Sequence, residues 1–214
     1  MTYAEVVPLF PTPLARSLNV LSDEQCDALL EYCKTTSYYY TNPEDLTSVK
    51  ISTDANVLNT FPNIKEKIET IITQTLRIQL GCVNSFQLKI TSSWATSTNL
   101  NSTGHQHSHF NSFWSGVIYF TDDVSPIYFH RPKVETSLKP NTNKVTPFNV
   151  DVSVHIPQKG ELIFFPSHIY HNISCNNSND FRYSIAFNTM PIGMFGSPTA
   201  GFNIQSVDDI TVSE

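Results

Sequence analysis

Three of the seven histidines of this chain, His105, His107 and His109, fall within five consecutive residues. A β-type run of apolar residues follows directly, at residues 112–120. Imidazole nitrogen is a good ligand for iron, zinc, copper and nickel alike. The cluster therefore predicts a metal site at the edge of a strand, without naming the metal.

A distant histidine can complete this site. Side chains alternate along an extended segment, so His107 and His109 point to the same side. A second strand-like run at residues 162–166 leads to His171, which can supply the third ligand from a neighbouring strand. His105 and His107 have the same spacing, however, and spacing alone does not choose between the two pairs. The other interpretation of such a cluster is a set of solvated loop histidines.

An arginine beyond the last of these histidines indicates an anion site. Arg182 lies in the apolar run 181–187, and Ser184 falls on the same face two residues later. A guanidinium inside a protein needs a partner, because an unpaired buried charge is costly. Its fork suits a carboxylate, and a serine hydroxyl adds a donor. The structural alternative is an internal ion pair with Asp151 or Asp122.

The elements that must position these residues come in two blocks. Ser22 and Gln25 form a capping-box pattern at the start of one predicted helix. A second helix should begin near Pro62 and end at Gly81, with apolar residues at a 3.6-residue period between them. Residues 6–14 alternate apolar residues with prolines, which predicts an extended edge element. Strands are predicted at residues 85–92, 113–121, 127–130, 144–156, 161–165, 171–175 and 182–189.

Helices followed by a run of strands predict a mainly β protein with flanking helices, in which the helices cover one face of a sandwich or jelly roll. The 214 residues fit a single domain, 1–214, with helical support at about 20–81 and a β core at about 85–190. The weakly patterned stretch 131–149 is a candidate lid, and with Trp94 and Trp114 it is expected to line the mouth of the barrel.

Composition and charge argue against two kinds of partner, nucleic acid and membrane. The formal net charge is −6 and no basic stripe is present, so nucleic acid is not expected. No apolar stretch approaches transmembrane length and the first residues lack the pattern of a signal peptide. The four scattered cysteines include no C-x-x-C pair and predict free thiols in a reducing compartment. A cytoplasmic location is therefore expected, in the host cytoplasm for a viral chain, with no membrane partner.

Four segments carry a resemblance to a known family: LFPTPL (9–14), HSHFNSFWSGVIYF (107–120), GELIFFPSHIYH (160–171) and RYSIAFN (182–188). In this order they resemble the 2-oxoglutarate/Fe(II) oxygenase superfamily, and in particular an oxygenase family common in marine bacteria and their phages. The resemblance covers nearly the whole chain. It implies a double-stranded β-helix, which is a jelly roll or cupin-like barrel.

The resemblance also implies a ligand set. Fe(II) would be held by His107, His109 and His171, and the distal carboxylate of 2-oxoglutarate would be bound by Arg182 and Ser184, with ascorbate as a possible reductant. One position departs from the superfamily pattern. The superfamily usually has a carboxylate two residues after the first histidine, where this chain has His109, so an all-histidine site would carry one less negative charge.

Three functions remain open from the sequence. The first is a dioxygenase that hydroxylates an unidentified small-molecule or peptide substrate. The second is a cupin-type metalloprotein of another class, and the third is a non-catalytic metal- or ligand-binding protein. Only the first requires a carboxylate clamp at Arg182 and Ser184. The sequence leaves the oligomeric state open.

Overall fold

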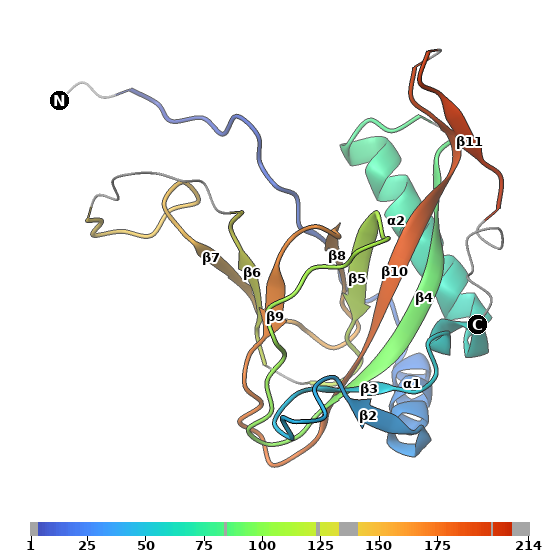
Figure 1. Cartoon of the computed structure of the whole chain (residues 1–214), viewed down its shortest axis with the longest axis vertical. Helices are drawn as coiled ribbons and strands as arrows, with labels where there is room; N and C mark the ends of the chain where they lie inside the picture. Colours follow the sequence, from blue (N-terminus) through green and yellow to red (C-terminus); the bar gives the residue numbers. More distant parts are fainter. Residues whose placement is uncertain (1–3, 84, 123–124, 133–140, 198, 207–214) are drawn as a thin grey trace.

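The structure is a computed structural model that describes residues 4–83, 85–122, 125–132, 141–197 and 199–206 (Figure 1). It contains two α-helices, α1 (Asp23–Thr35) and α2 (Pro62–Gln79), and a short 3-10 helix, Val57–Thr60. The strands are β1 (Ala15–Ser17), β2 (Tyr38–Tyr40), β3 (Lys50–Ser52), β4 (Gln87–Thr98), β5 (Trp114–Ile118), β6 (Ile127–His130), β7 (Val152–His155), β8 (Leu162–Pro166), β9 (His171–Ile173), β10 (Arg182–Phe195) and β11 (Phe202–Ile204).

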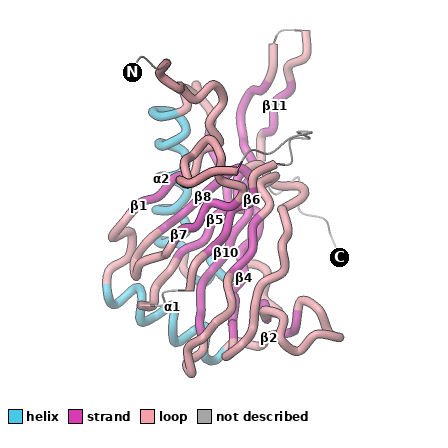
Figure 2. The backbone as a smooth tube through the Cα atoms, turned by 90° about the vertical axis from the view of Figure 1, so that its left-hand side faces the viewer, coloured by secondary structure: helices cyan, strands magenta, loops and turns pink. Residues whose placement is uncertain are grey.

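The strands form two facing sheets. The larger has the order β1-β8-β5-β10-β4-β3-β2, with β11 paired to β10, and the smaller has the order β7-β6-β9. Figure 1 shows the smaller sheet set apart from the larger one, with α1 and α2 on the far side of the larger sheet, and Figure 2 shows the strands side by side from another direction. This is the jelly roll, or double-stranded β-helix, with flanking helices that the sequence predicts.

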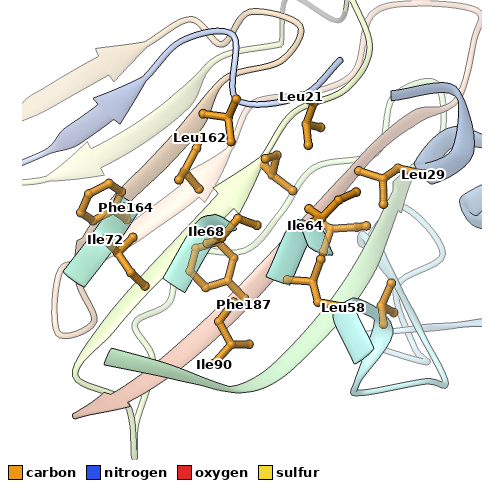
Figure 3. Packing of buried hydrophobic residues seen from close by; sticks show 14 of the residues in the cluster. Leu21, Leu29, Leu58, Ile64, Ile68, Ile72, Ile90, Leu162, Phe164 and Phe187 are labelled. Atoms are coloured by element: carbon orange, nitrogen blue, oxygen red, sulfur yellow. The ribbon is translucent and has the colours of Figure 1, made fainter. Parts of the chain in front are cut away.

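The larger sheet separates two apolar cores, because alternate side chains of its strands face opposite ways. Leu162 and Phe164 of β8 pack in the core under the helices, whereas Ile163 and Phe165 lie in the core between the sheets. Figure 3 shows the first core. Gly116 of β5 allows the close packing there, since a Cβ atom at this position would lie 2.7 Å from the carbonyl oxygen of Ile163.

Local signals explain both helices. The Gln25 backbone N–H donates to Ser22 Oγ at 3.3 Å, and the Ser22 N–H donates to Gln25 Oε1 at 3.0 Å, which confirms the predicted capping box of α1. Pro62 is the first residue of α2, where its missing N–H costs nothing. Gly81 follows the helix with a φ of 71°. Neither helix, nor any other in the described residues, has the length and apolar character needed to cross a membrane.

Several strand boundaries differ from prediction. β4 and β10 run beyond residues 92 and 189, because they pair with each other along nearly their whole length, which sustains strands through polar residues. Of residues 144–156, only Val152–His155 form a strand, since Thr146 and Asn149 close a turn before it. Residues 6–14 form no strand, as their prolines lack donors, and edge pairing with β8 begins at Ala15.

Candidate metal centre

Three imidazoles converge at one edge of the smaller sheet. His107 and His109 lie in the segment between β4 and β5, and His171 is the first residue of β9. One ring nitrogen from each lies within 4.8 Å of the other two. The Nε2 atoms of His109 and His171 are 3.3 Å apart. His107 is exposed to solvent while His171 is buried, so the cluster opens to one side.

Backbone pairing sets this arrangement. His107 and His171 form an antiparallel bridge, in which the His107 N–H donates to the His171 carbonyl at 3.0 Å and the reverse bond measures 2.9 Å. Two residues further on, the His109 N–H donates to the Ser167 carbonyl at 2.9 Å. The predicted alternation of His107 and His109 is thus anchored on a strand some sixty residues away in the sequence.

Two of the rings are oriented by carbonyl groups. Nδ1 of His107 lies 2.7 Å from the carbonyl oxygen of His105, and Nδ1 of His171 lies 2.9 Å from that of Ile169. A carbonyl oxygen can only accept, so Nδ1 must carry the proton in each ring. Nε2 then carries the free lone pair of each ring, and Nε2 of His171 lies 3.3 Å from Nε2 of His109. Outer contacts of this kind fix the tautomer of metal-binding histidines.

Aromatic rings enclose the buried side of the cluster. The His109 ring lies 5.7 Å from the Trp94 ring on one side and stacks at 5.1 Å on His171 on the other. His171 also contacts Phe165 at 4.7 Å between ring centroids and Phe129 at 6.1 Å. Both phenylalanines belong to the core between the sheets.

This enclosure keeps the imidazoles of His109 and His171 neutral. Burial, with a smaller contribution from the charge of neighbouring His107, lowers the pKa of His109 to about 4 and the pKa of His171 to about 3. The charged form of a histidine is disfavoured when water is excluded from its ring. At neutral pH both rings are therefore in the form that binds a metal.

His105 lies apart from the three converging rings. Its Nε2 is 3.5 Å from the Asp45 carboxylate, and more than half of its side chain is exposed. Of the two pairs that the spacing allows, the geometry brings His107 and His109, rather than His105 and His107, to His171.

Arg182 is buried on the interior face of the larger sheet. It is the first residue of β10 and is 3% exposed, and its guanidinium carbon lies 5.8 Å from the centre of the Tyr119 ring. Tyr119 shares the core between the sheets with the phenylalanines that contact His171. Ser184 is on the same face of β10, with its Oγ 2.6 Å from Thr96 Oγ1.

Sequence reasoning missed one residue beside Arg182. Thr98 pairs directly with Arg182 across β10 and β4, so the two side chains share the interior face. Thr98 is 1% exposed, and its hydroxyl makes no hydrogen bond within the described residues. Strand alternation would have found it only if β4 had been predicted to reach residue 98.

The expected mouth of the barrel needs a correction. Trp94 lies beside the metal cluster, but Trp114 does not: it is buried against Phe164, at 5.7 Å between rings, on the side of the sheet that faces the helices. Part of the stretch 131–149 lines an apolar groove of about 1070 Å³, together with residues 8–14 and with Phe129 and Phe165, the two phenylalanines that contact His171. Residues 133–140 of this candidate lid lie outside the described residues.

Comparison with known structures agrees with the fold. A 2OG-Fe(II) oxygenase from Burkholderia pseudomallei is 11% identical, with a TM-score of 0.58 over 82% of this chain and 84% of that chain. A Pseudomonas putida prolyl-4-hydroxylase is 13% identical, with a TM-score of 0.53 over 84% and 94% of the two chains. The α-ketoglutarate-dependent epimerase SnoN from nogalamycin biosynthesis is 10% identical, with a TM-score of 0.59 over 84% and 78%.

Comparison with protein families covers the site itself. No curated protein sequence matches the chain. Residues 92–188 match the family described as "Putative 2OG-Fe(II) oxygenase". The matched segment includes the three converging histidines and the Arg182–Ser184 pair. Over residues 92–188, this chain is therefore similar to the 2OG-Fe(II) oxygenase family.

Proposed function

We propose that the chain is an Fe(II)- and 2-oxoglutarate-dependent dioxygenase whose metal is held by His107, His109 and His171. The observation that carries this proposal is the convergence of one nitrogen from each ring within 4.8 Å. The Nδ1–carbonyl bonds of His107 and His171 leave Nε2 of each ring as the nitrogen that can bind a metal. Three ligands on one side of a metal leave positions for a co-substrate and oxygen.

The three histidines fit a divalent metal, but they bring no negative charge to it. All three ligands are imidazoles, and the lowered pKa values of His109 and His171 keep these two rings neutral at pH 7. A neutral ligand at position 109, in place of a carboxylate, leaves the bound metal more electrophilic and less easily oxidised. Oxygen activation should therefore be slower than in a site that has a carboxylate.

The interior face of the larger sheet fits the distal carboxylate of 2-oxoglutarate. Arg182 supplies a buried cation and Ser184 a hydroxyl. Thr98 adds a buried hydroxyl that has no partner in the described structure, and such a group is costly unless something binds it. A carboxylate between Arg182 and Thr98 would accept from both.

The chain's own residues bind, orient and exclude water. Arg182, Ser184 and Thr98 would fix the distal end of the co-substrate, so that its keto-acid end faces the histidines. Trp94, Phe129 and Phe165 shield the buried side of the cluster, while exposed His107 leaves the other side open to substrate. When bound, iron and 2-oxoglutarate supply the oxidising chemistry, which is the cofactors' own.

The substrate class stays open between a small molecule and a peptide. The similar structures include both a prolyl-4-hydroxylase and an epimerase of nogalamycin biosynthesis, so this fold serves more than one kind of reaction. A second function, a metal-binding protein without turnover, is favoured by a single feature, the histidine at position 109.

Turnover of 2-oxoglutarate tests the proposal. The purified protein with Fe(II), ascorbate and oxygen should form succinate slowly in the absence of added substrate, and His109→Asp should raise the rate. His171→Ala is the control that removes a buried ligand. The dioxygenase function is wrong if neither the wild type nor His109→Asp consumes 2-oxoglutarate above an iron-free control. The non-catalytic metal-binding function would then take its place, provided that metal still binds.

A further inference from the structure

A cluster of three serine hydroxyls adjoins the segment that carries His109, whose N–H donates to the carbonyl of one of them, Ser167. Ser167 Oγ is 2.8 Å from both Ser112 Oγ and Ser115 Oγ. Ser115 Oγ in turn donates to Asn188 Oδ1 at 2.8 Å. Ser115 and Ser167 are each 1% exposed, so no bulk water competes for the contact between them, whereas Ser112 is half-buried. Buried polar clusters linked in this way restrict the movement of their members.

Ser167 also bonds through its backbone to both ends of the turn that carries His109. Its carbonyl accepts the His109 N–H at 2.9 Å, and its own N–H donates to the Phe113 carbonyl at 3.2 Å. Asn111, between these two points, has a φ of 55° in the left-handed region. The turn is thus bonded to one residue at each end and, through Ser112 Oγ, in its middle.

The far side of the hydroxyl cluster is fixed on β10. The Thr189 N–H donates to Ser112 Oγ at 3.3 Å, and the pairing of β10 with β4 shifts register between Asn188 and Thr189. Such bulges bend a strand and redirect its side chains, and they are frequent beside active sites. The strand that anchors the His109 turn is therefore the strand that begins with Arg182.

His109 needs this support more than the other two histidines do. The rings of His107 and His171 are each oriented by a bond from Nδ1 to a carbonyl. Among the described residues, Nδ1 of His109 has no such bond, and the ring is held by stacking on His171 and by contact with the tilted Trp94 ring. Stacking leaves a ring free to slide, so its position depends on the backbone beneath it.

We propose that Ser167 is a positioning residue for the metal ligand His109, acting through its hydroxyl contacts with Ser112 and Ser115. The inference rests on the proposed metal site and assigns a role to a residue outside the ligand set. Loss of the hydroxyl leaves the partner serines without one of their bonds and lets the turn shift. Residues that support a metal ligand typically change metal affinity by about 10- to 100-fold.

Cobalt(II) titration of the metal-free protein tests this role without turnover. Ser167→Ala should weaken Co(II) binding by about 10-fold and change the visible absorption bands of the bound ion. The matched control is Ser52→Ala. Ser52 is also buried, at 3% exposed, and makes two hydrogen bonds, to the Asp54 carbonyl at 2.6 Å and from the Ala95 N–H at 3.0 Å. The Ser52 variant should melt earlier yet keep both affinity and spectrum.

A His109→Ala background shows whether the effect passes through His109. Adding Ser167→Ala to this background should cause no further loss of Co(II) affinity, because the positioned ligand is already gone. Ser112→Ala replaces Ser167→Ala if the latter does not fold. Unchanged affinity and spectrum in the single variant, or an equal loss in the His109→Ala background, overturns the inference. A wild type that binds no Co(II) instead removes the proposed metal site itself.

Discussion

Replacement of Thr98 by valine separates ligand binding from folding. Thr98 lies opposite Arg182 in the β4–β10 register and is 1% exposed, and its hydroxyl has no hydrogen bond within the described residues. Valine has nearly the shape of threonine, so Thr98→Val exchanges the hydroxyl for a methyl group and leaves the packing intact. Thr98→Val should therefore stabilise the ligand-free protein and weaken its binding of 2-oxoglutarate.

The magnitudes follow from burial. A buried polar group without a partner costs about 1–3 kcal/mol, so removing it should raise the free energy of unfolding of the ligand-free protein by about 1 kcal/mol. A hydrogen bond to a charged group contributes about 1.5–3 kcal/mol. At about 1.4 kcal/mol per tenfold change, the Kd for 2-oxoglutarate should rise by about 10- to 100-fold.

Thr96→Val is the matched control, two residues earlier on the same face of β4. Its hydroxyl is 2.6 Å from Ser184 Oγ and donates to the Ser184 carbonyl at 3.3 Å, so valine there should destabilise the protein by about 1 kcal/mol. Urea denaturation gives the stabilities, and calorimetric titration with 2-oxoglutarate in the presence of Mn(II) gives the Kd. Destabilisation by Thr98→Val together with an unchanged Kd would refute the reasoning.

Two further predictions concern charge. Arg182→Ala should raise the Kd for 2-oxoglutarate by about 10-fold or more, since one side of a buried charged pair is lost. Arg131→Ala, which removes an exposed guanidinium bonded to the Pro147 carbonyl, should leave the Kd unchanged, and equal affinities of both variants would contradict the clamp. The free energy of unfolding of the metal-free protein should fall as the pH drops from 6.5 toward 4, because the unfolded chain binds protons at His109 and His171 that the folded chain, with lowered pKa values, does not. Urea midpoints at pH 7 and 5 check this, and a slope unaltered by His171→Gln would contradict it.

Local signals in the sequence were enough to predict much of the fold. The capping box at Ser22, the proline that begins α2 and the strand Ile127–His130 are each set by residues within a few positions of one another. Alternation likewise placed His107 and His109 on one side of an extended segment, and it placed Arg182 and Ser184 on one face of β10.

Features that depend on distant pairing could not be predicted. β4 reaches Thr98 because β10 pairs with it more than eighty residues later, so the unpaired hydroxyl beside Arg182 could not be predicted from the sequence. Trp114 was expected at the mouth of the barrel, yet the register of β5 with β8 turns it toward the helices. The hydroxyl contacts of Ser167 depend in the same way on the meeting of three separate segments.

For His109, the sequence predicts the charge of the ligand but not the surroundings of its ring. The sequence shows that this residue is a histidine, which predicts a site with one less negative charge than a site with a carboxylate. Its surroundings come only from the fold: the ring fills the space between Trp94 and His171, and it reaches to 3.3 Å from the His171 nitrogen. Aspartate is shorter and would leave part of that space empty, so His109→Asp changes reach as well as charge. His109→Glu, which restores more of the length with the same charge, separates the two effects: a faster rate in both variants assigns the slow turnover to charge.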